Sequence, residues 1–215
     1  MGTLQKNKMK KIIIAISISL IFILFFIAFI SYEFSPYKHS EKYSYKNVVD
    51  NTVVINEPID SVFRMLGHSS YARQWSVFVH HITPLNSNEV ADGTPGSTRR
   101  CYTQEDEKGI VWDEKILIVE PNQRRRLSIY NTKGFESESN DLFTEQLYEK
   151  IDSNTTKLTF VVFRDESKNM EWWKQALLYY IAYDMKTIFE NNMENIKYLA
   201  EEGSNYHRRH ELKTN

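Results

Sequence analysis

The sequence contains little cysteine and few residues that interrupt regular structure. Cys101 is the single cysteine among 215 residues, which excludes a framework of intramolecular disulfides. The chain has 7 glycines and 5 prolines, and no glycines are grouped into a phosphate-binding loop. A Ser-His-Asp pattern and a Cys-x-x-Cys motif are missing as well. These absences argue against the common hydrolases and nucleotide-dependent enzymes.

Charge is missing from a long apolar segment near the N-terminus, Ile12 to Ile30. Of its 19 residues, 15 are Ile, Leu or Phe. A helix of that length spans about 28 Å, which is close to the hydrocarbon thickness of a bilayer. The segment ends in Ala28-Phe29-Ile30-Ser31, a poor cleavage site. We therefore expect an uncleaved transmembrane helix over residues 12–31 rather than a signal peptide.

The lysines before this segment predict its orientation. Lys6, Lys8, Lys10 and Lys11 carry all the charge that precedes Glu33. We expect residues 1–11 to be cytoplasmic and the rest of a single-pass membrane protein to lie on the extracytoplasmic side. Beyond these four lysines, 23 of the 27 basic side chains remain beside 28 acidic ones, a net charge of −5. This balance argues against nucleic acid as a partner.

Proline and glycine are also absent from Trp172 to Glu202, and this stretch predicts one long C-terminal helix. Gly203 follows, at the place where a glycine commonly caps a helix. Apolar residues recur every three or four positions, with Asn192 as the exception: Ile181, Met185, Ile188, Ile196 and Leu199. The first half is apolar almost all round. It is either buried on two sides, or its tyrosines and tryptophans line a ligand cavity or contact lipid.

Seven segments before this helix predict β-strands, and two short helices, 58–66 and 69–75, follow the first of them. The strand segments are 46–56, 78–85, 97–104, 110–120, 125–130, 142–151 and 157–164. Short turns between strands imply an antiparallel sheet, and one of its faces needs a cover. Only the last helix is long enough to provide it. We expect an α+β domain over residues 46–203, with a curved sheet around the helix and an apolar cavity between them.

Five motifs in this order carry a family resemblance: Val54–Phe63, Tyr71–Trp75, Glu114–Pro121, Thr155–Phe160 and Asn195–Glu201. They resemble the helix-grip domain of the START and Bet v 1-like superfamily (SRPBCC), particularly its polyketide cyclase/dehydrase and lipid-transport branch. Phe63 stands where that family often has tryptophan. The resemblance implies a helix-grip fold over residues 46–203. Its known functions range from lipid carriers and hormone binders to aromatic cyclases and co-chaperones, so the fold alone does not select one.

The candidate site is the cavity between sheet and helix. Trp112, Glu114 and Ile116 share one face of their strand by alternation, and we take that face as inward. The predicted cavity wall consists of Trp112, Glu114, Ile116, Phe160, Tyr180 and Asp184. Glu114 either pairs with a basic group such as Arg100 or anchors a ligand head group. A further alternative is a general acid or base with a raised pKa.

Three other groups of residues give no catalytic constellation. His80 and His81, as strand neighbours, point to opposite faces and do not chelate a metal as a pair. Cys101 is expected to be a small buried residue, because no orienting acid accompanies it. Arg124 to Arg126 predict a solvated strand edge, or a site for anionic lipid head groups. We therefore expect no catalytic residue, no metal and no cofactor.

The main functional hypothesis is a membrane-anchored, non-catalytic binding module for a hydrophobic small molecule or lipid. One alternative is a polyketide cyclase/dehydratase-like enzyme that acts in the same cavity. Another is an envelope structural or stress protein with a protein partner, which predicts a filled cavity and an exposed apolar patch. Residues 32–45 are expected to be a tether between the membrane helix and the domain, and residues 204–215 a disordered tail.

Overall fold

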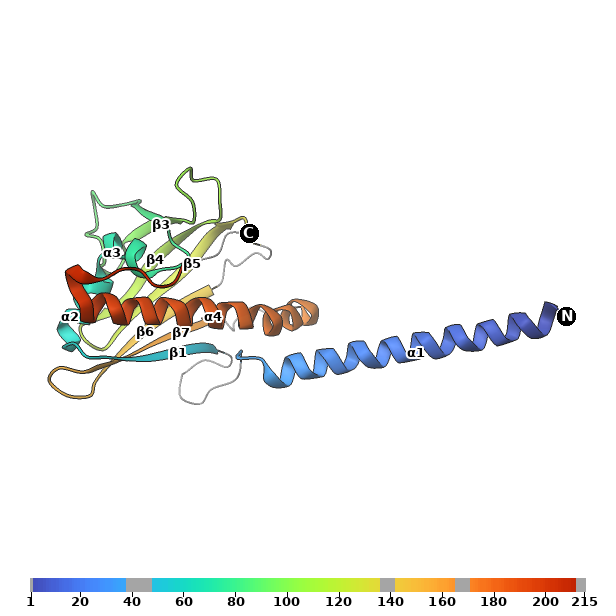
Figure 1. Cartoon of the computed structure of the whole chain (residues 1–215). Coiled ribbons are helices and arrows are strands. Elements are labelled where there is room, and N and C mark those ends of the chain that lie inside the picture. Colours follow the sequence, from blue (N-terminus) through green and yellow to red (C-terminus); the bar gives the residue numbers. More distant parts are fainter. Residues whose placement is uncertain (1, 38–47, 136–141, 165–170, 212–215) are drawn as a thin grey trace.

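The chain folds as an α+β domain with a long helix that projects from one end (Figure 1). The computed structural model describes residues 2–37, 48–135, 142–164 and 171–211. In chain order the elements are α1 (Gly2–Phe34), β1 (Val48–Ile55), α2 (Ile59–Gly67), α3 (Ser69–Trp75), β2 (His81–Pro84), β3 (Thr98–Tyr102), β4 (Val111–Glu120), β5 (Arg124–Lys133), β6 (Leu142–Lys150), β7 (Thr156–Arg164), α4 (Trp172–Glu202) and a short 3-10 turn, η1 (Gly203–Asn205).

The seven strands form one antiparallel sheet in the order β1-β7-β6-β5-β4-β3-β2. Consecutive strands from β2 to β7 pair with one another. The first strand, β1, pairs with β7 instead of with β2. Two register shifts in β4 mark bulges, between Val111 and Asp113 and between Ile116 and Ile118. Bulges increase the local bend and twist of a strand, so the sheet curves. The predicted curved antiparallel sheet is confirmed.

Helix α4 lies along one face of this sheet, as the sequence predicts (Figure 1). It has 31 residues, about 46 Å at 1.5 Å each. It ends at Gly203, whose positive φ of 54° and backbone hydrogen bond to Leu199 form the cap. Met193 and Ile196 are buried in the main core, which also contains Ile55, Val62, Leu66, Tyr148, Leu158 and Phe160. The helix-grip architecture is therefore confirmed.

The exception in the apolar stripe of α4 has a structural role. Asn192 is buried, and its side-chain oxygen accepts a hydrogen bond of 2.7 Å from the backbone N–H of Val77. Asn195 is fully buried and donates to the carbonyl oxygens of Trp75 and His210. Because a buried amide without partners is costly, these two side chains fix α4 against the end of α3, the segment that follows it and the C-terminal tail.

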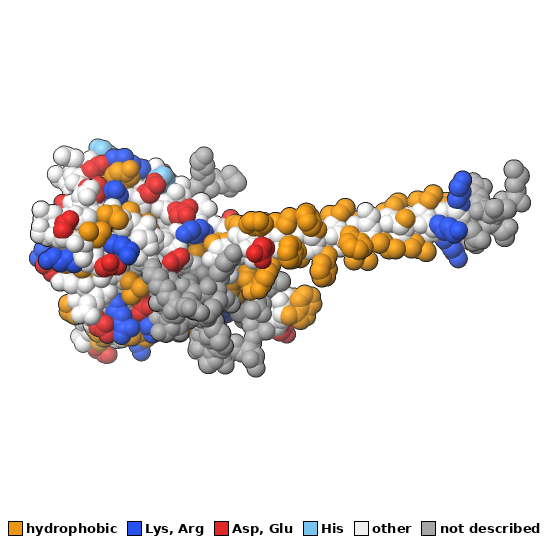
Figure 2. Space-filling view, turned by 90° about the horizontal axis from the view of Figure 1, so that it is seen from below, with side chains coloured by type: hydrophobic (Ala, Val, Ile, Leu, Met, Phe, Trp, Pro, Cys, Tyr) orange, Lys and Arg blue, Asp and Glu red, His pale blue; other side chains and the backbone are white. Residues whose placement is uncertain are grey.

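The apolar N-terminal segment is helical and exposed along its length. Helix α1 contains a stretch, Lys8–Phe34, that is long and apolar enough to cross a membrane, and that stretch is not buried against the domain. Figure 2 shows hydrophobic side chains along α1 and lysines near its N-terminal end. The helix continues to Phe34, so Tyr32 to Phe34 are helical rather than part of a tether. Residues 38–45 of the predicted tether lie outside the described residues.

The C-terminal tail differs from its prediction. Residues 206–211 fold back along α4 instead of being disordered, because Asn195 holds their backbone. Its side-chain oxygen accepts hydrogen bonds from the N–H groups of Arg209 and His210, at 3.2 and 3.1 Å. Residues 212–215 of the predicted tail lie outside the described residues.

Candidate ligand-binding site

An ion pair lies on the inner face of the sheet, where the apolar cavity was predicted. Strand register places Arg99 of β3 opposite Glu114 of β4. The Arg99 guanidinium donates to the Glu114 carboxylate at 2.8 and 2.7 Å, and the indole N–H of Trp112 donates to the other carboxylate oxygen at 3.0 Å. The side chains of Arg99 and Glu114 are 12 and 14% exposed. Glu114 is therefore a nearly buried carboxylate with both oxygens engaged.

The ion pair continues into a short polar network. Arg99 also donates to the Ser69 hydroxyl at 3.0 Å. That hydroxyl donates in turn to Asp92 at 2.8 Å, and the Ser69 backbone N–H donates to the same carboxylate at 3.2 Å. This network connects the start of α3 and the turn before β3 with the middle of the sheet. Buried polar groups of this kind specify one arrangement of the elements that carry them.

A second buried cation lies on β5, on the other side of β4 from Arg99. Arg125 is 3% exposed and donates to the Gln146 side chain, the Tyr148 hydroxyl and the Phe63 carbonyl. Its guanidinium stacks 4.5 Å from the centre of the Phe63 ring. Burial raises the pKa of Tyr148 well above its usual value, so the phenol stays neutral. The interior near α2 therefore contains charge as well as apolar side chains.

A groove lies beside this interior, between α4, the segment after α3, and the C-terminal tail. Its volume is about 1080 Å³. One face of α4 provides Asp184, Thr187, Ile188 and Asn191, and Val77 and Phe78 line the opposite side together with residues 208–211. A second hollow of about 520 Å³ also borders on Val77, Phe78 and Arg208, and extends to the loop between β3 and β4.

The floor of this groove leads to the polar network through an aromatic cluster. The Phe78 ring lies 5.4 Å from that of Trp112 and 6.1 Å from that of Phe135, centre to centre. Trp112 is 6% exposed, and its core cluster includes Ala72, Val79 and Cys101. Phe78 therefore connects the groove to Trp112, and Trp112 in turn donates to Glu114.

The tail forms the polar wall of the groove. Arg208 donates to the carbonyl oxygens of Arg73 and Ser76 at 3.0 and 3.3 Å, and it pairs with Glu211 at 2.8 Å. Arg209 stacks 3.5 Å from the centre of the Tyr198 ring, and His210 contacts Glu194 at 2.6 Å. These contacts hold the tail through its side chains as well as through Asn195.

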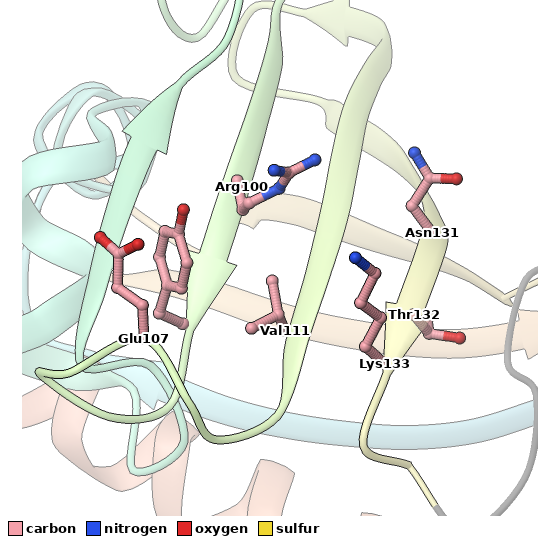
Figure 3. A pocket seen from close by; sticks show the side chains of 7 residues that line it. Arg100, Glu107, Val111, Asn131, Thr132 and Lys133 are labelled. Atoms are coloured by element: carbon pink, nitrogen blue, oxygen red, sulfur yellow. The ribbon is translucent and has the colours of Figure 1, made fainter.

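A different hollow, of about 550 Å³, lies on the other face of the sheet. Figure 3 shows its lining side chains, which come from β3, β4, β5 and the loop between β3 and β4. Arg100 donates to Asp113 at 2.7 and 3.0 Å, and Asn131 donates to the same carboxylate at 2.9 Å. Burial raises the pKa of Asp113, but the hydrogen bonds from Arg100 and Asn131 outweigh burial and lower it. This carboxylate is thus held ionised by its partners.

The six predicted cavity residues occupy different environments. Ile116 and Phe160 are buried in the core, and Trp112 and Glu114 form the hydrogen bond described above. Asp184 lines the groove. Tyr180 is 65% exposed, near the start of α4. The partner of Glu114 is Arg99 and not Arg100, because adjacent residues of β3 point to opposite faces and Arg100 meets Asp113.

Two further expectations are wrong. His80 precedes β2 rather than lying within it, so its side chain is not directed away from that of His81, and their Nδ1 atoms are 3.1 Å apart. Arg125 does not lie on a solvated edge, because β5 is an inner strand. Cys101 is fully buried, as expected, and burial raises the pKa of its thiol. Within the described residues, no three His, Cys, Asp or Glu side chains are grouped to bind a metal.

Sequence reasoning missed three parts of the site: Arg99, Arg125 and the tail wall. The signal for Arg99 and Arg125 was weak. Arg99 is followed by Arg100, and Arg125 lies between Arg124 and Arg126, so alternation alone does not say which arginine faces inward. The tail carries no apolar periodicity. Asn195, which holds the tail, lies outside the apolar stripe that the sequence shows, so no pattern indicated that the tail packs there.

Comparison with solved structures gives the fold. No protein-family model matches the sequence, and no curated protein matches it. A protein from Thermobifida fusca matches with a TM-score of 0.54 and 14% identity, over 76% of this chain and 98% of that chain. The di-domain ARO/CYC protein BexL of the BE-7585A biosynthetic pathway matches with a TM-score of 0.52 and 10% identity, over 70% of this chain and 45% of that one. Ara h 8.0201 matches with a TM-score of 0.50 and 13% identity, over 71% and 96%.

These similarities show that the protein has a helix-grip fold, like that of Ara h 8.0201 and BexL. The resemblance identified in the sequence is therefore confirmed at the level of the fold. At identities of 10 to 14%, the similarity says nothing further about the chemistry of this chain.

Proposed function

We propose that this protein is a membrane-anchored, non-catalytic binding module for a hydrophobic small molecule or lipid. The observation that carries the proposal is the groove of about 1080 Å³ beside α4, in a fold that typically binds hydrophobic ligands. Residues 12–31 of α1 span the membrane, with residues 1–11 in the cytoplasm and the domain on the extracytoplasmic side. The exposed apolar surface of α1 supports this anchorage.

The composition of the groove favours an amphipathic ligand. Val77, Phe78 and Ile188 provide apolar surface, whereas Asp184 and the tail residues 208–211 provide polar groups. A groove of this volume is large enough for a drug-sized or lipid-sized molecule. The apolar part of the ligand packs on Phe78, and its polar part lies against the tail.

The engagement of Glu114 supports binding rather than catalysis. Its two carboxylate oxygens accept hydrogen bonds from Arg99 and from Trp112. Neither oxygen is therefore free to act as a base. Cys101 is fully buried with a raised pKa, so it offers no thiolate nucleophile. The enzymatic alternative, a cyclase or dehydratase, depends on Glu114. A turnover that Glu114→Gln abolishes, with the fold retained, would favour it.

Native mass spectrometry of the full chain, purified in mild detergent from its own cells, tests the proposal. We expect a bound lipid or other hydrophobic molecule. Ile188→Trp fills the groove and should abolish the adduct, whereas Glu190→Trp adds the same indole at an exposed position of α4 and should retain it. Absence of any adduct in the wild-type protein, or equal adducts in both variants, would contradict binding in this groove.

The anchorage has a separate test. Alkaline carbonate should leave the full chain in the membrane fraction, because a transmembrane helix is not removed by high pH. A membrane-impermeant thiol reagent should label Glu190→Cys in intact cells when the domain is extracytoplasmic. Extraction by carbonate, or labelling only after lysis, would contradict the anchor or its orientation respectively.

A further inference from the structure

The first turns of α4 are exposed and rich in aromatic side chains. The five large apolar residues there are Trp172 at 80%, Trp173 at 50%, Leu177 at 36%, Tyr180 at 65% and Tyr183 at 40% exposure. We call them the aromatic end of α4. The second half of the same helix is buried in the core. An exposed apolar patch of this kind, next to a packed domain, marks an interaction surface.

This aromatic end lies directly beside the point where α1 meets the domain. The Ser35 hydroxyl, fully buried, donates to the carbonyl oxygen of Tyr179 at 2.7 Å. The Tyr179 ring packs edge-on against Tyr32 at 4.9 Å and against Tyr37 at 5.8 Å. Tyr179 is therefore at the same level along α1 as Tyr32, two residues beyond the end of the apolar segment at Ile30.

The N-terminal end of α4 points toward the side where α1 enters the membrane. In Figure 1 the N-terminal end of α4 points the same way as the N-terminal end of α1 and passes the point where α1 ends. From Tyr179 back to Trp172 are seven residues, which is about 10 Å along a helix. The headgroup region on each side of a bilayer is roughly 6 Å thick or slightly more. Trp172 thus reaches the boundary between headgroups and hydrocarbon when Tyr32 lies at headgroup level.

We infer that the aromatic end of α4 inserts into the bilayer interface beside α1, so that a lipid surface is its partner. Trp and Tyr are the residues that concentrate at this depth. Lys174 and Glu171 form an i,i+3 ion pair at 3.6 Å, and Lys174 also lies 5.3 Å from the centre of the Trp173 ring. Paired charges beside aromatic rings are compatible with a position at the membrane interface, but not with one at the hydrocarbon centre. Figure 2 shows hydrophobic side chains at the end of the domain that adjoins α1.

This inference rests on the proposed anchorage of α1 and adds to it. Anchorage through α1 alone would hold the protein in the bilayer without placing the surface of the domain against it. A second contact, through α4, holds the domain against the bilayer with a defined orientation. It also places the groove at Asp184 five residues beyond Tyr179, about 8 Å from the headgroup level. A lipid would then have a short path from the membrane to the groove.

Site-directed spin labelling tests the inference on the full chain in vesicles of phosphatidylcholine and phosphatidylglycerol. Trp172→Cys, in a Cys101→Ala background, carries the label at an exposed position that the fold does not need. Glu190→Cys is the matched control, on the same helix about 27 Å farther along. We expect a ratio of oxygen to nickel-chelate accessibility several-fold higher at position 172 than at position 190.

Each result has a defined meaning. Equal and water-like accessibility at both positions, with the chain retained after carbonate, overturns the inference and leaves the α1 anchor intact. Exclusion of both reagents at position 172, with spin–spin broadening between chains, shows a second copy as the occupant and also overturns it. Loss of the chain in carbonate overturns the anchorage itself, and the inference with it.

Discussion

Removal of one partner from the Arg99–Glu114 ion pair should destabilise the domain strongly. Glu114→Gln preserves the side-chain volume and an acceptor for Trp112, but it leaves the Arg99 charge without a carboxylate partner. Loss of one member of a buried pair costs about 3–5 kcal/mol. Since Arg99 keeps its hydrogen bond to Ser69, we expect the lower end, about 3 kcal/mol. For a domain of this size, that lowers Tm by roughly 6–12 °C.

A double-mutant cycle separates the pair from its surroundings. Arg99→Met combined with Glu114→Leu removes both charges and should be much less destabilising than the sum of the single changes, by about 2 kcal/mol or more. Thermal unfolding of the full chain in detergent, followed by circular dichroism, measures the stability of four proteins: the wild type, Arg99→Met, Glu114→Leu and the double variant. Asp106→Asn is the control, because its pair with Lys108 is 3.4 Å apart and exposed, and should change Tm little. Additive single changes below about 1 kcal/mol each would refute the description of a coupled buried pair.

Three further predictions follow from local geometry. Asp113 has a lowered pKa, so its stabilising effect is complete above its ordinary value of 3.8 and is lost as pH falls through the lowered value in the folded state; Asp113→Asn should make stability less dependent on pH below 4, and an unchanged acid denaturation profile would contradict this. Cys101 should not react with a thiol reagent in the folded protein and should react fully in denaturant, since it is fully buried with a raised pKa; rapid labelling of the native protein would show otherwise. Gly93→Ala should destabilise the domain more than Gly96→Ala: both glycines have positive φ, 81° and 90°, but only at position 93 would the added Cβ meet a backbone atom, the carbonyl oxygen of Gly67, at 2.4 Å. Equal melting temperatures for the two variants would contradict the contact with Gly67.

Local sequence patterns accounted for the elements and their order. Helix α4 was predictable to its last residue because no proline or glycine interrupts it before Gly203, and a glycine with positive φ ends it. The strands were predictable because alternation and turn residues are local signals. The end of β5 was less clear: the sequence predicts a strand that ends at residue 130, yet β5 continues to Lys133, which pairs with Val111 of β4.

Tertiary register decided which charged residues form the interior. Arg99 and Arg100 are adjacent, as are Asp113 and Glu114. The sequence alone does not say which arginine lies opposite which carboxylate. A shift of one residue between β3 and β4 would place Arg99 opposite Asp113, or Arg100 opposite Glu114, and would leave the other arginine without a carboxylate opposite it. The structure puts Arg99 with Glu114 inside and Arg100 with Asp113 outside. Likewise Arg125 is buried because β5 is an inner strand and this side chain lies on the face covered by α2, where it donates to the Phe63 carbonyl.

By itself, the sequence determined an apolar N-terminal helix of membrane-spanning length, seven strands, and a long final helix for them to grip, because each depends on residues that are neighbours in the chain. Only the tertiary structure decided that the tail packs on Asn195, that Tyr180 is exposed, and that Tyr179 meets Tyr32 and Ser35. The last contact joins residues 144 positions apart. Contacts over such separations depend on how completed elements pack, and no local period in the sequence specifies that.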